Sequence, residues 1–325
     1  MNRTKKQSPD FLPYGRQLVD EDDIAAVNEV LRSDWLTAGP ATEAFEKAIT
    51  EATGARYAIA CSSGTAALHL ISVALGLRQN DVAVVPAITF LATANSPHLA
   101  GADIVFTDVD PDTGLMTAET FRQAIKKHPP DRIKVVFAVH LNGQAAPLEE
   151  LSAVAKEHGI AIVEDGCHAL GSTYRTADGS QNKVGDCRYS AATAFSFHPV
   201  KTIAMGEGGA VTTNDTDLAQ RVRSLRNHGM ERDPATFSYP DQGLDRSGSP
   251  NPWYYEMHSP GFNYRASDIH CALGLSQLSK LSLFSERRRQ LMKLYNEELA
   301  GLTPAVMPVH RVGILLIPYC TCIPY

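Results

Sequence analysis

Short apolar runs alternate along most of this chain with stretches of helical pattern, and this alternation limits the possible folds more than any other feature. We predict strands over 57–61, 82–85, 103–107, 135–139, 160–163 and 191–197. We predict amphipathic helices over 65–75, 92–100, 117–127 and 148–157. Strands that alternate with helices form mostly parallel sheets with helices on both faces. The sequence therefore predicts an α/β fold whose ligands bind beyond the carboxyl ends of the strands.

Further helices are predicted before the first strand and after the last one. The acidic run 20–23 suits the positive end of a helix dipole and begins the first helix, and a second helix covers about 42–53. Beyond about residue 215 we predict a helix over 218–228, a polar loop over 232–257 and helical sequence over 267–299. We therefore expect a large domain, residues 1–230, and a smaller C-terminal domain, residues 231–325.

Composition excludes several classes of protein. The chain has 325 residues, of which 44% are hydrophobic and 20% charged, and a net charge of −6, which disfavours disorder and a nucleic-acid-binding surface. The six cysteines form no CxxC pair, which argues against a zinc site and a disulfide framework. The start lacks the apolar core of a signal peptide, and no apolar run approaches the ~18 residues of a membrane span. We expect a cytoplasmic protein without a metal or a membrane anchor.

Three features at strand ends carry chemical information. Residues 62–65 (SSGT) lie between a predicted strand and a helix, which suits a phosphate site or an ordinary helix cap. Asp165 ends an apolar strand and is either a ligand contact or a solvated loop acid. Lys201 lies on a short loop after a buried strand, where an amine can act as a nucleophile, although most lysines are surface charges. Together these features meet the needs of pyridoxal phosphate (PLP): a phosphate cradle, a carboxylate and an amine.

Eight segments in order along residues 13–299 resemble the DegT/DnrJ/EryC1/StrS family of sugar-nucleotide aminotransferases. They are PYGRQLVDEDDIAAVNEVLRSDWLTAGP, SSGTAALHL, PAITFLATAN, VHLNGQ, VEDGCHALGSTY, FSFHPVKTIAMGEGGAVTTND, RNHG and GFNYRASDIHCALGLSQL. The resemblance implies the PLP-dependent transferase fold of type I, as in aspartate aminotransferase. The sequences HPVK (198–201), YGRQ (14–17) and WYYEM (253–257) are most similar to the branch of this family that serves pseudaminic acid biosynthesis.

The resemblance also implies a role for each matching residue. Lys201 matches the lysine that binds the cofactor covalently and shuttles a proton, and Asp165 matches the carboxylate beside the ring nitrogen. The other implied cofactor contacts are Gly64, Thr65, Phe90 stacked on the ring, His168, Ser196 and, from a second subunit, Asn263. The implied substrate contacts are Tyr14, Asp34, Trp35, Leu36, Thr37, Ser63, Gln144, Ser196 and Asn263.

The implied activity is transfer of an amino group from L-glutamate to a UDP-linked 4-keto-6-deoxy-N-acetylhexosamine, in a homodimer whose active sites are shared. Two alternatives stay open. The chain can act on another nucleotide keto sugar, or it can be an inactive remnant, because the resemblance stops near residue 299 and an apolar tail follows (311–325). We expect a truncated C-terminal domain and a poorly packed tail. Relatives that dehydrate sugars carry His at the lysine position, so Lys201 argues against that reaction.

Overall fold

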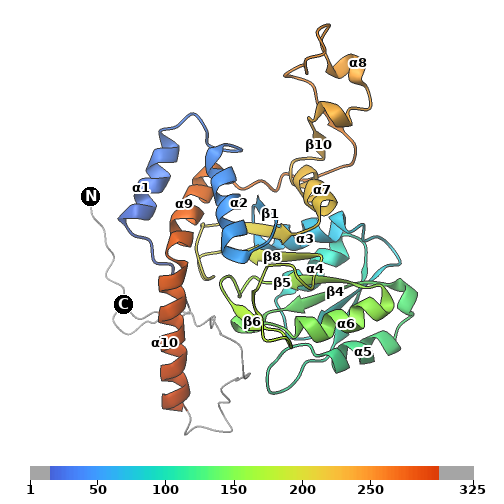
Figure 1. Ribbon diagram of the computed structural model, residues 1–325, viewed down its shortest axis with the longest axis vertical. Coiled ribbons are helices and arrows are strands. Elements are labelled where there is room, and N and C mark those ends of the chain that lie inside the picture. Colours follow the sequence, from blue (N-terminus) through green and yellow to red (C-terminus); the bar gives the residue numbers. More distant parts are fainter. Residues whose placement is uncertain (1–14, 300–325) are drawn as a thin grey trace.

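A computed structural model describes residues 15–299 and contains a central seven-stranded sheet (Figure 1). In order across the sheet the strands are β1 (Tyr57–Cys61), β9 (Gly209–Thr213), β8 (Ala192–Ser196), β5 (Ala161–Asp165), β4 (Ile133–Val139), β2 (Val82–Pro86) and β3 (Asp103–Thr107). Strand β9 is antiparallel to both of its neighbours, and the other pairs are parallel. The predicted mostly parallel sheet is confirmed.

Helices cover both faces of this sheet. Successive side chains of a strand point to opposite faces, so apolar residues on both faces need helices to bury them. In β2, Val82 and Val84 belong to one core, and Ala83 and Val85 belong to the other. The helices between the strands are α3 (Gly64–Ala74), α4 (Leu91–Leu99), α5 (Ala118–Lys126), α6 (Leu148–His158) and α7 (Thr216–Arg226). The prediction that the first of these is amphipathic is wrong. Helix α3 packs against the sheet, α4 and α7, and is therefore buried on nearly every side.

Four helices from the two ends of the described chain pack together beside the sheet (Figure 1). They are α1 (Glu21–Leu31), α2 (Pro40–Thr53), α9 (Asp268–Ser279) and α10 (Leu281–Leu299). The helical sequence predicted over 267–299 is thus two helices that separate at Lys280. The carboxylate of Asp268 joins α9 to the start of α2, since it accepts hydrogen bonds from Gly39 N, Ala41 N and the Thr42 hydroxyl at 2.7–3.0 Å. The division into domains at residue 230 stays a prediction.

The polar loop predicted over 232–257 is a projecting arm (Figure 1). Its base is the short strand pair β10 (Met230–Glu231) and β11 (Glu256–Met257), and it carries α8 (Pro240–Gly243). A second small pair joins β6 (Thr173–Arg175) and β7 (Gln181–Lys183), and 3₁₀ turns lie at Pro130–Arg132, Leu141–Gly143 and Pro234–Thr236. Within residues 15–299, none of the helices has the length and apolar character to cross a membrane. The apolar tail lies outside the described residues.

Candidate active site

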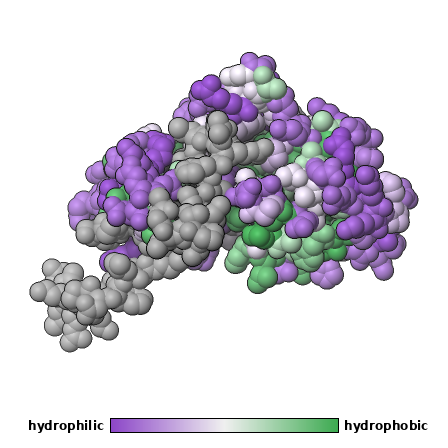
Figure 2. Space-filling model, turned by 90° about the horizontal axis from the view of Figure 1, so that it is seen from below, coloured by the Kyte–Doolittle hydropathy of each residue, from purple (hydrophilic) through white to green (hydrophobic). Residues whose placement is uncertain are grey.

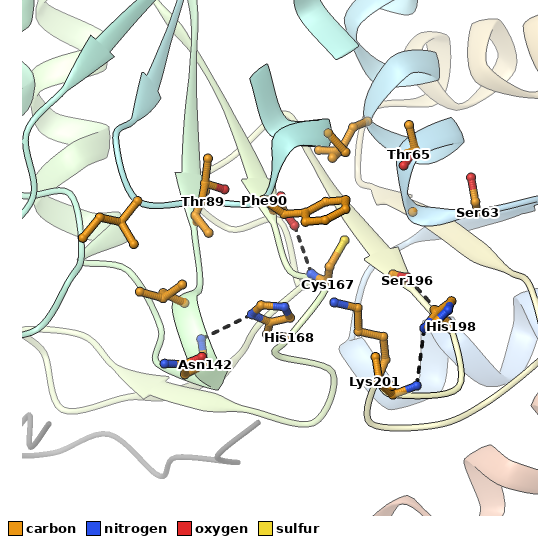
Figure 3. Close-up of a pocket in the computed structure, with 18 of the residues that line it drawn as sticks. Ser63, Thr65, Thr89, Phe90, Asn142, Cys167, His168, Ser196, His198 and Lys201 are labelled. Carbon is orange, nitrogen blue, oxygen red and sulfur yellow. Dashed lines mark hydrogen bonds between the residues drawn. The ribbon is translucent and has the colours of Figure 1, made fainter. Parts of the chain in front are cut away.

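The carboxyl ends of several parallel strands open into one cavity of about 650 Å³ (Figure 3). It lies where β1, β2, β4, β5 and β8 end, as expected for a parallel sheet. The predicted residues that line the cavity are Ser63, Gly64, Thr65, Phe90, Asp165, His168, Ser196 and Lys201. The fold therefore brings together residues as far apart in the sequence as Ser63 and Lys201.

The first turn of α3 forms one wall of this cavity. Ser63 caps the helix, and its hydroxyl accepts a hydrogen bond of 3.1 Å from the backbone N–H of Ala66. The first N–H groups of a helix have no acceptor within the helix, so they favour an anion at this position. Any larger residue at position 64 would displace this turn, because a Cβ there would lie 2.6 Å from Cβ of Ser196. Residues 62–65 were interpreted from the sequence as either a helix cap or a phosphate site. In the structure the cap at Ser63 leaves the first turn of α3 facing the cavity, so the two interpretations are compatible.

Asp165 lies at the end of β5 and is only 6% exposed. Its Oδ2 accepts a hydrogen bond of 2.7 Å from the hydroxyl of Thr93, and its Oδ1 accepts one of 3.2 Å from the backbone N–H of Cys167. Oγ1 of Thr93 is also 2.8 Å from Oγ1 of Thr89. Asp165 is therefore buried, and both of its carboxylate oxygens accept hydrogen bonds from the protein. The solvated-acid alternative for Asp165 is therefore wrong.

Lys201 follows β8 on a short loop, and its backbone N–H donates to the carbonyl of His198 at 2.8 Å. Burial lowers the pKa of the Lys201 amine, and nearby Asp165 counteracts part of this effect. Cys167 beside it stays a neutral thiol, because burial raises its pKa well above the usual range. A lowered pKa increases the fraction of neutral, nucleophilic amine near pH 7. This environment differs from that of a surface lysine.

His168 enters the cavity in a defined protonation state. Its Nδ1 accepts a hydrogen bond of 3.4 Å from the backbone N–H of Asn142, so the proton of the neutral ring is on Nε2. Burial and the charge of Lys201 lower the pKa of His168 to about 4, against the attraction of Asp165. The imidazole is therefore neutral at pH 7 and can donate a hydrogen bond from Nε2.

Phe90 presents a flat apolar surface to the cavity (Figure 3). It precedes the first residue of α4 and is 67% exposed. An aromatic ring of this kind can stack on a planar ligand. The cavity thus offers the start of a helix for a phosphate, a carboxylate for a ring nitrogen, an amine for an aldehyde and a ring for stacking. These residues fit PLP.

Several predicted substrate residues do not line the cavity. Gln144 is buried, and its Nε2 donates to the carbonyl of Thr113 at 3.1 Å. Asp34, Trp35 and Leu36 follow α1 and are exposed. Thr37 forms a backbone bridge with Ser267, and the exposed Asn263 forms one with Asn227. Tyr14 lies outside the described residues. The sequence analysis in turn did not single out Thr89, Asn142, His198 and Glu207, which do line the cavity.

A metal is not suggested by the described residues, since no group of three or more His, Cys, Asp or Glu side chains in 15–299 could hold one. The four cysteines in this range, Cys61, Cys167, Cys187 and Cys271, are free thiols. Both observations concern only the described part of the chain.

Comparison with known proteins gives a consistent result. The model of the DegT/DnrJ/EryC1/StrS aminotransferase family matches residues 17–314. The uncharacterised protein MJ1066 of Methanocaldococcus jannaschii is 35% identical over 298 residues, which are 92% of this chain and 72% of that protein.

Solved structures give the same fold. Helicobacter pylori PseC, an aminotransferase involved in the biosynthesis of pseudaminic acid, matches with a TM-score of 0.77 and 30% identity, over 89% of this chain and 70% of that one. Spr1654 from Streptococcus pneumoniae in its PLP form matches with a TM-score of 0.78 and 27% identity, over 95% and 76% of the two chains. This chain therefore belongs to the DegT/DnrJ/EryC1/StrS aminotransferase family of PLP-dependent, fold-type-I enzymes.

Proposed function

We propose that this chain transfers the amino group of L-glutamate to the keto carbon of a UDP-linked 4-keto-6-deoxy-N-acetylhexosamine, on the route to pseudaminic acid. The observation that carries the aminotransferase activity is the meeting of Lys201, Asp165 and the start of α3 in one cavity. The sugar is inferred from the HPVK and WYYEM sequences and from the similarity to PseC. The proposed localisation is the cytoplasm.

The residues of the cavity divide the work between binding and proton transfer. When bound, PLP supplies an electron sink for the pair left behind as the donor's α-carbon loses its proton. With PLP in the cavity, the Lys201 amine would hold the aldehyde carbon with loss of water. Once the donor's amine has replaced it there, the freed Lys201 amine would carry that proton. Asp165 would keep the ring nitrogen protonated, and Gly64, Thr65 and Ser196 would hold the phosphate. His168 would donate from Nε2 to the ring oxygen, and Phe90 would stack on the ring.

A homodimer with shared sites is part of this proposal. Asn263 is exposed and outside the cavity of its own chain, so it is available to the phosphate region of a second copy. Ile88, Phe90 and Leu91 expose apolar side chains beside the cavity, each at least half exposed. Figure 2, which views the molecule from below relative to Figure 1, also shows an apolar area among hydrophilic surroundings. Exposed apolar area of this kind favours association.

The proposed substrate contacts are weighted by where they lie. Ser63 and Ser196 line the cavity and are the strongest candidates. Gln144 is buried and does not line the cavity, so it is a weaker candidate than Ser63 and Ser196. The exposed turn 34–37 and Tyr14 are proposed to contact the sugar nucleotide, and this part of the proposal rests only on the resemblance to the family's sequence pattern.

The test uses the full chain with added PLP. We expect an absorbance band of lysine-bound cofactor, its loss on adding L-glutamate, and its return with a UDP-linked 4-keto sugar, whose 4-amino product is identified by mass spectrometry. Lys201→Ala should abolish all three changes, whereas Lys47→Ala, on an exposed lysine of α2, should not alter them.

The outcomes separate the alternatives. Return of the band with other nucleotide keto sugars only would assign the chain to another branch of the family. A protein that binds PLP at Lys201 but never responds to L-glutamate would be an inactive remnant. A protein that shows no lysine-bound cofactor at all contradicts the proposed function.

A further inference from the structure

Side chains of α9 and α10 hold the backbone of the Lys201 loop. Arg288 of α10 is 7% exposed; its Nη2 donates to the carbonyl of Lys201 at 3.0 Å, and its Nη1 donates to that of Thr202 at 3.2 Å. Gln277 of α9 is 1% exposed, and its Oε1 accepts from the backbone N–H of Ala204 at 3.3 Å. Three of the four residues from 201 to 204 are therefore held by side chains of α9 and α10.

These contacts are anchored to the N-terminal helix. Nε2 of Gln277 donates to Oδ2 of the fully buried Asp23 in α1 at 2.7 Å and to the carbonyl of Leu18 at 2.8 Å. Oδ1 of Asp23 accepts from the Ser276 hydroxyl at 2.6 Å and is 3.0 Å from Nζ of Lys280. Although burial alone raises the pKa of Asp23, these hydrogen bonds hold it below its usual value. The loop is thus attached to a buried hydrogen-bond network that includes α1.

We propose that Arg288 is a positioning residue for the amine chemistry of Lys201. The proposal rests on the proposed function, because it assigns Arg288 to the reaction of that lysine. A guanidinium holds its donors in a fixed plane, so Arg288 fixes two consecutive carbonyls at once. The Lys201 side chain reaches the cavity from this backbone, and a displacement of about 1 Å in a reacting group can lower a rate by about 100-fold.

Arg288 does not line the cavity, and it acts in this proposal through the backbone carbonyls of the loop. A merely structural arginine would only stabilise the packing of α10, and its loss would lower the melting temperature alone. A positioning role also predicts that the Lys201 loop opens locally and that covalent capture of PLP slows. These local readouts separate the two roles.

Three variants form the test. Arg288→Met keeps much of the apolar stem and removes both hydrogen bonds, and Arg288→Lys keeps the charge but loses the planar fork. The matched control is Arg287→Met, on the adjacent residue of the same helix, whose side chain is exposed and contacts Gln290.

The first readout is hydrogen exchange of the cofactor-free protein over 197–205, and the second is the rate at which the absorbance of lysine-bound PLP develops. For Arg288→Met we expect exchange about tenfold faster in this segment, with α5 and α6 unchanged, and covalent capture about tenfold slower. The turnover number should fall by a similar factor, with KM for L-glutamate within about threefold of wild type. Arg288→Lys should lie between wild type and Arg288→Met, and Arg287→Met should equal wild type.

Wild-type exchange and capture in Arg288→Met, whatever its melting temperature, would overturn the proposal. If Arg288→Met does not fold, Arg288→Lys decides: slowed capture with faster local exchange supports the positioning role, and wild-type behaviour overturns it. If the wild-type protein itself captures no PLP, the proposed function fails. Normal capture by the wild type together with unchanged variants overturns only the role of Arg288.

Discussion

Asp165 shows how much a catalytic side chain depends on residues that the sequence does not place near it. The position of Asp165 at the end of an apolar strand was predictable, because such acids lie at the ligand-binding edge of a parallel sheet. Its main partner, Thr93, is 72 positions away and comes from α4. Thr89 and Thr93 are four residues apart at the start of that helix, which is the one available signal. A hydroxyl pair so spaced is too common to be recognised alone.

The hydroxyl of Thr93 should support turnover. Thr93→Val leaves the buried carboxylate of Asp165 without its shortest hydrogen bond, and such a bond to a charged group contributes about 1.5–3 kcal/mol. We expect Thr93→Val to lower kcat about tenfold and Asp165→Asn to lower it by on the order of 100-fold or more. Thr93→Ser, which keeps the hydroxyl, serves as the control. Steady-state kinetics would contradict this account if Thr93→Val and Thr93→Ser behaved alike.

Other residue assignments depend on contacts that no local pattern contains. Lys201 was predictable from its loop and from the resemblance, and its lowered pKa agrees with burial on that loop. Gln144 was expected at the sugar, yet its amide donates to Thr113, 31 positions earlier. Arg288 was not singled out, because its partners are carbonyls 86 and 87 positions earlier. Side-chain contacts over such separations follow only from the packed fold.

At the scale of elements, the start of α3 packs closely against other parts of the cavity. The helix begins at Gly64 directly behind β1, and its first turn packs against Ser196 at the end of β8. The clearance is small, because a Cβ on Gly64 would also lie 3.1 Å from Sγ of Cys167. A change of one methyl group at Gly64 therefore moves the first turn relative to the rest of the cavity.

Gly64→Ala should weaken PLP binding in a protein that still folds. The added Cβ would be 2.6 Å from Cβ of Ser196, so the start of α3 has to shift away from the strand. We expect the dissociation constant of PLP, measured by fluorescence titration, to rise about tenfold or more. Far-UV circular dichroism should stay close to that of wild type. Affinity within about twofold of wild type would show that the first turn of α3 does not hold the phosphate.

The predicted elements agree with the structure where local pattern decides them. All six predicted strands are present, with ends that differ by at most two residues. Strand β9 was missed, because its sequence GAVTT follows glycines that read as part of the lysine loop. The break at Lys280 was also missed, since the apolar pattern continues through it. Local pattern indicates the type of an element better than its packing environment.

At the scale of the whole molecule, segments from both ends of the described range, residues 15–299, meet beside the sheet. Helices α9 and α10 pack near α1 and α2 and reach the Lys201 loop, so the N-terminal and C-terminal parts share one structure around the site. A change of sequence pattern does not reveal this packing, because it depends on long-range contacts such as Asp23 with Gln277. The division into domains at residue 230 stays a prediction.

Subunit sharing can be tested by complementation. We expect Lys201→Ala and Asn263→Ala homodimers each to lose most activity. A heterodimer of the two, co-expressed with different affinity tags, should contain one intact site and recover about half of wild-type turnover per dimer. No recovery would show that both residues serve the same chain's site. A monomeric protein with full activity would refute sharing altogether.

The central claim is that Lys201 binds PLP covalently in order to transfer an amino group, and reductive trapping tests it most directly. The PLP-loaded protein is treated with borohydride, digested and mapped by mass spectrometry, with and without prior incubation with L-glutamate. We expect a phosphopyridoxyl group on Lys201 alone, and its loss after L-glutamate, which converts the cofactor to its free amine form. A label on any other lysine, or a label on Lys201 that L-glutamate leaves unchanged, would contradict the account.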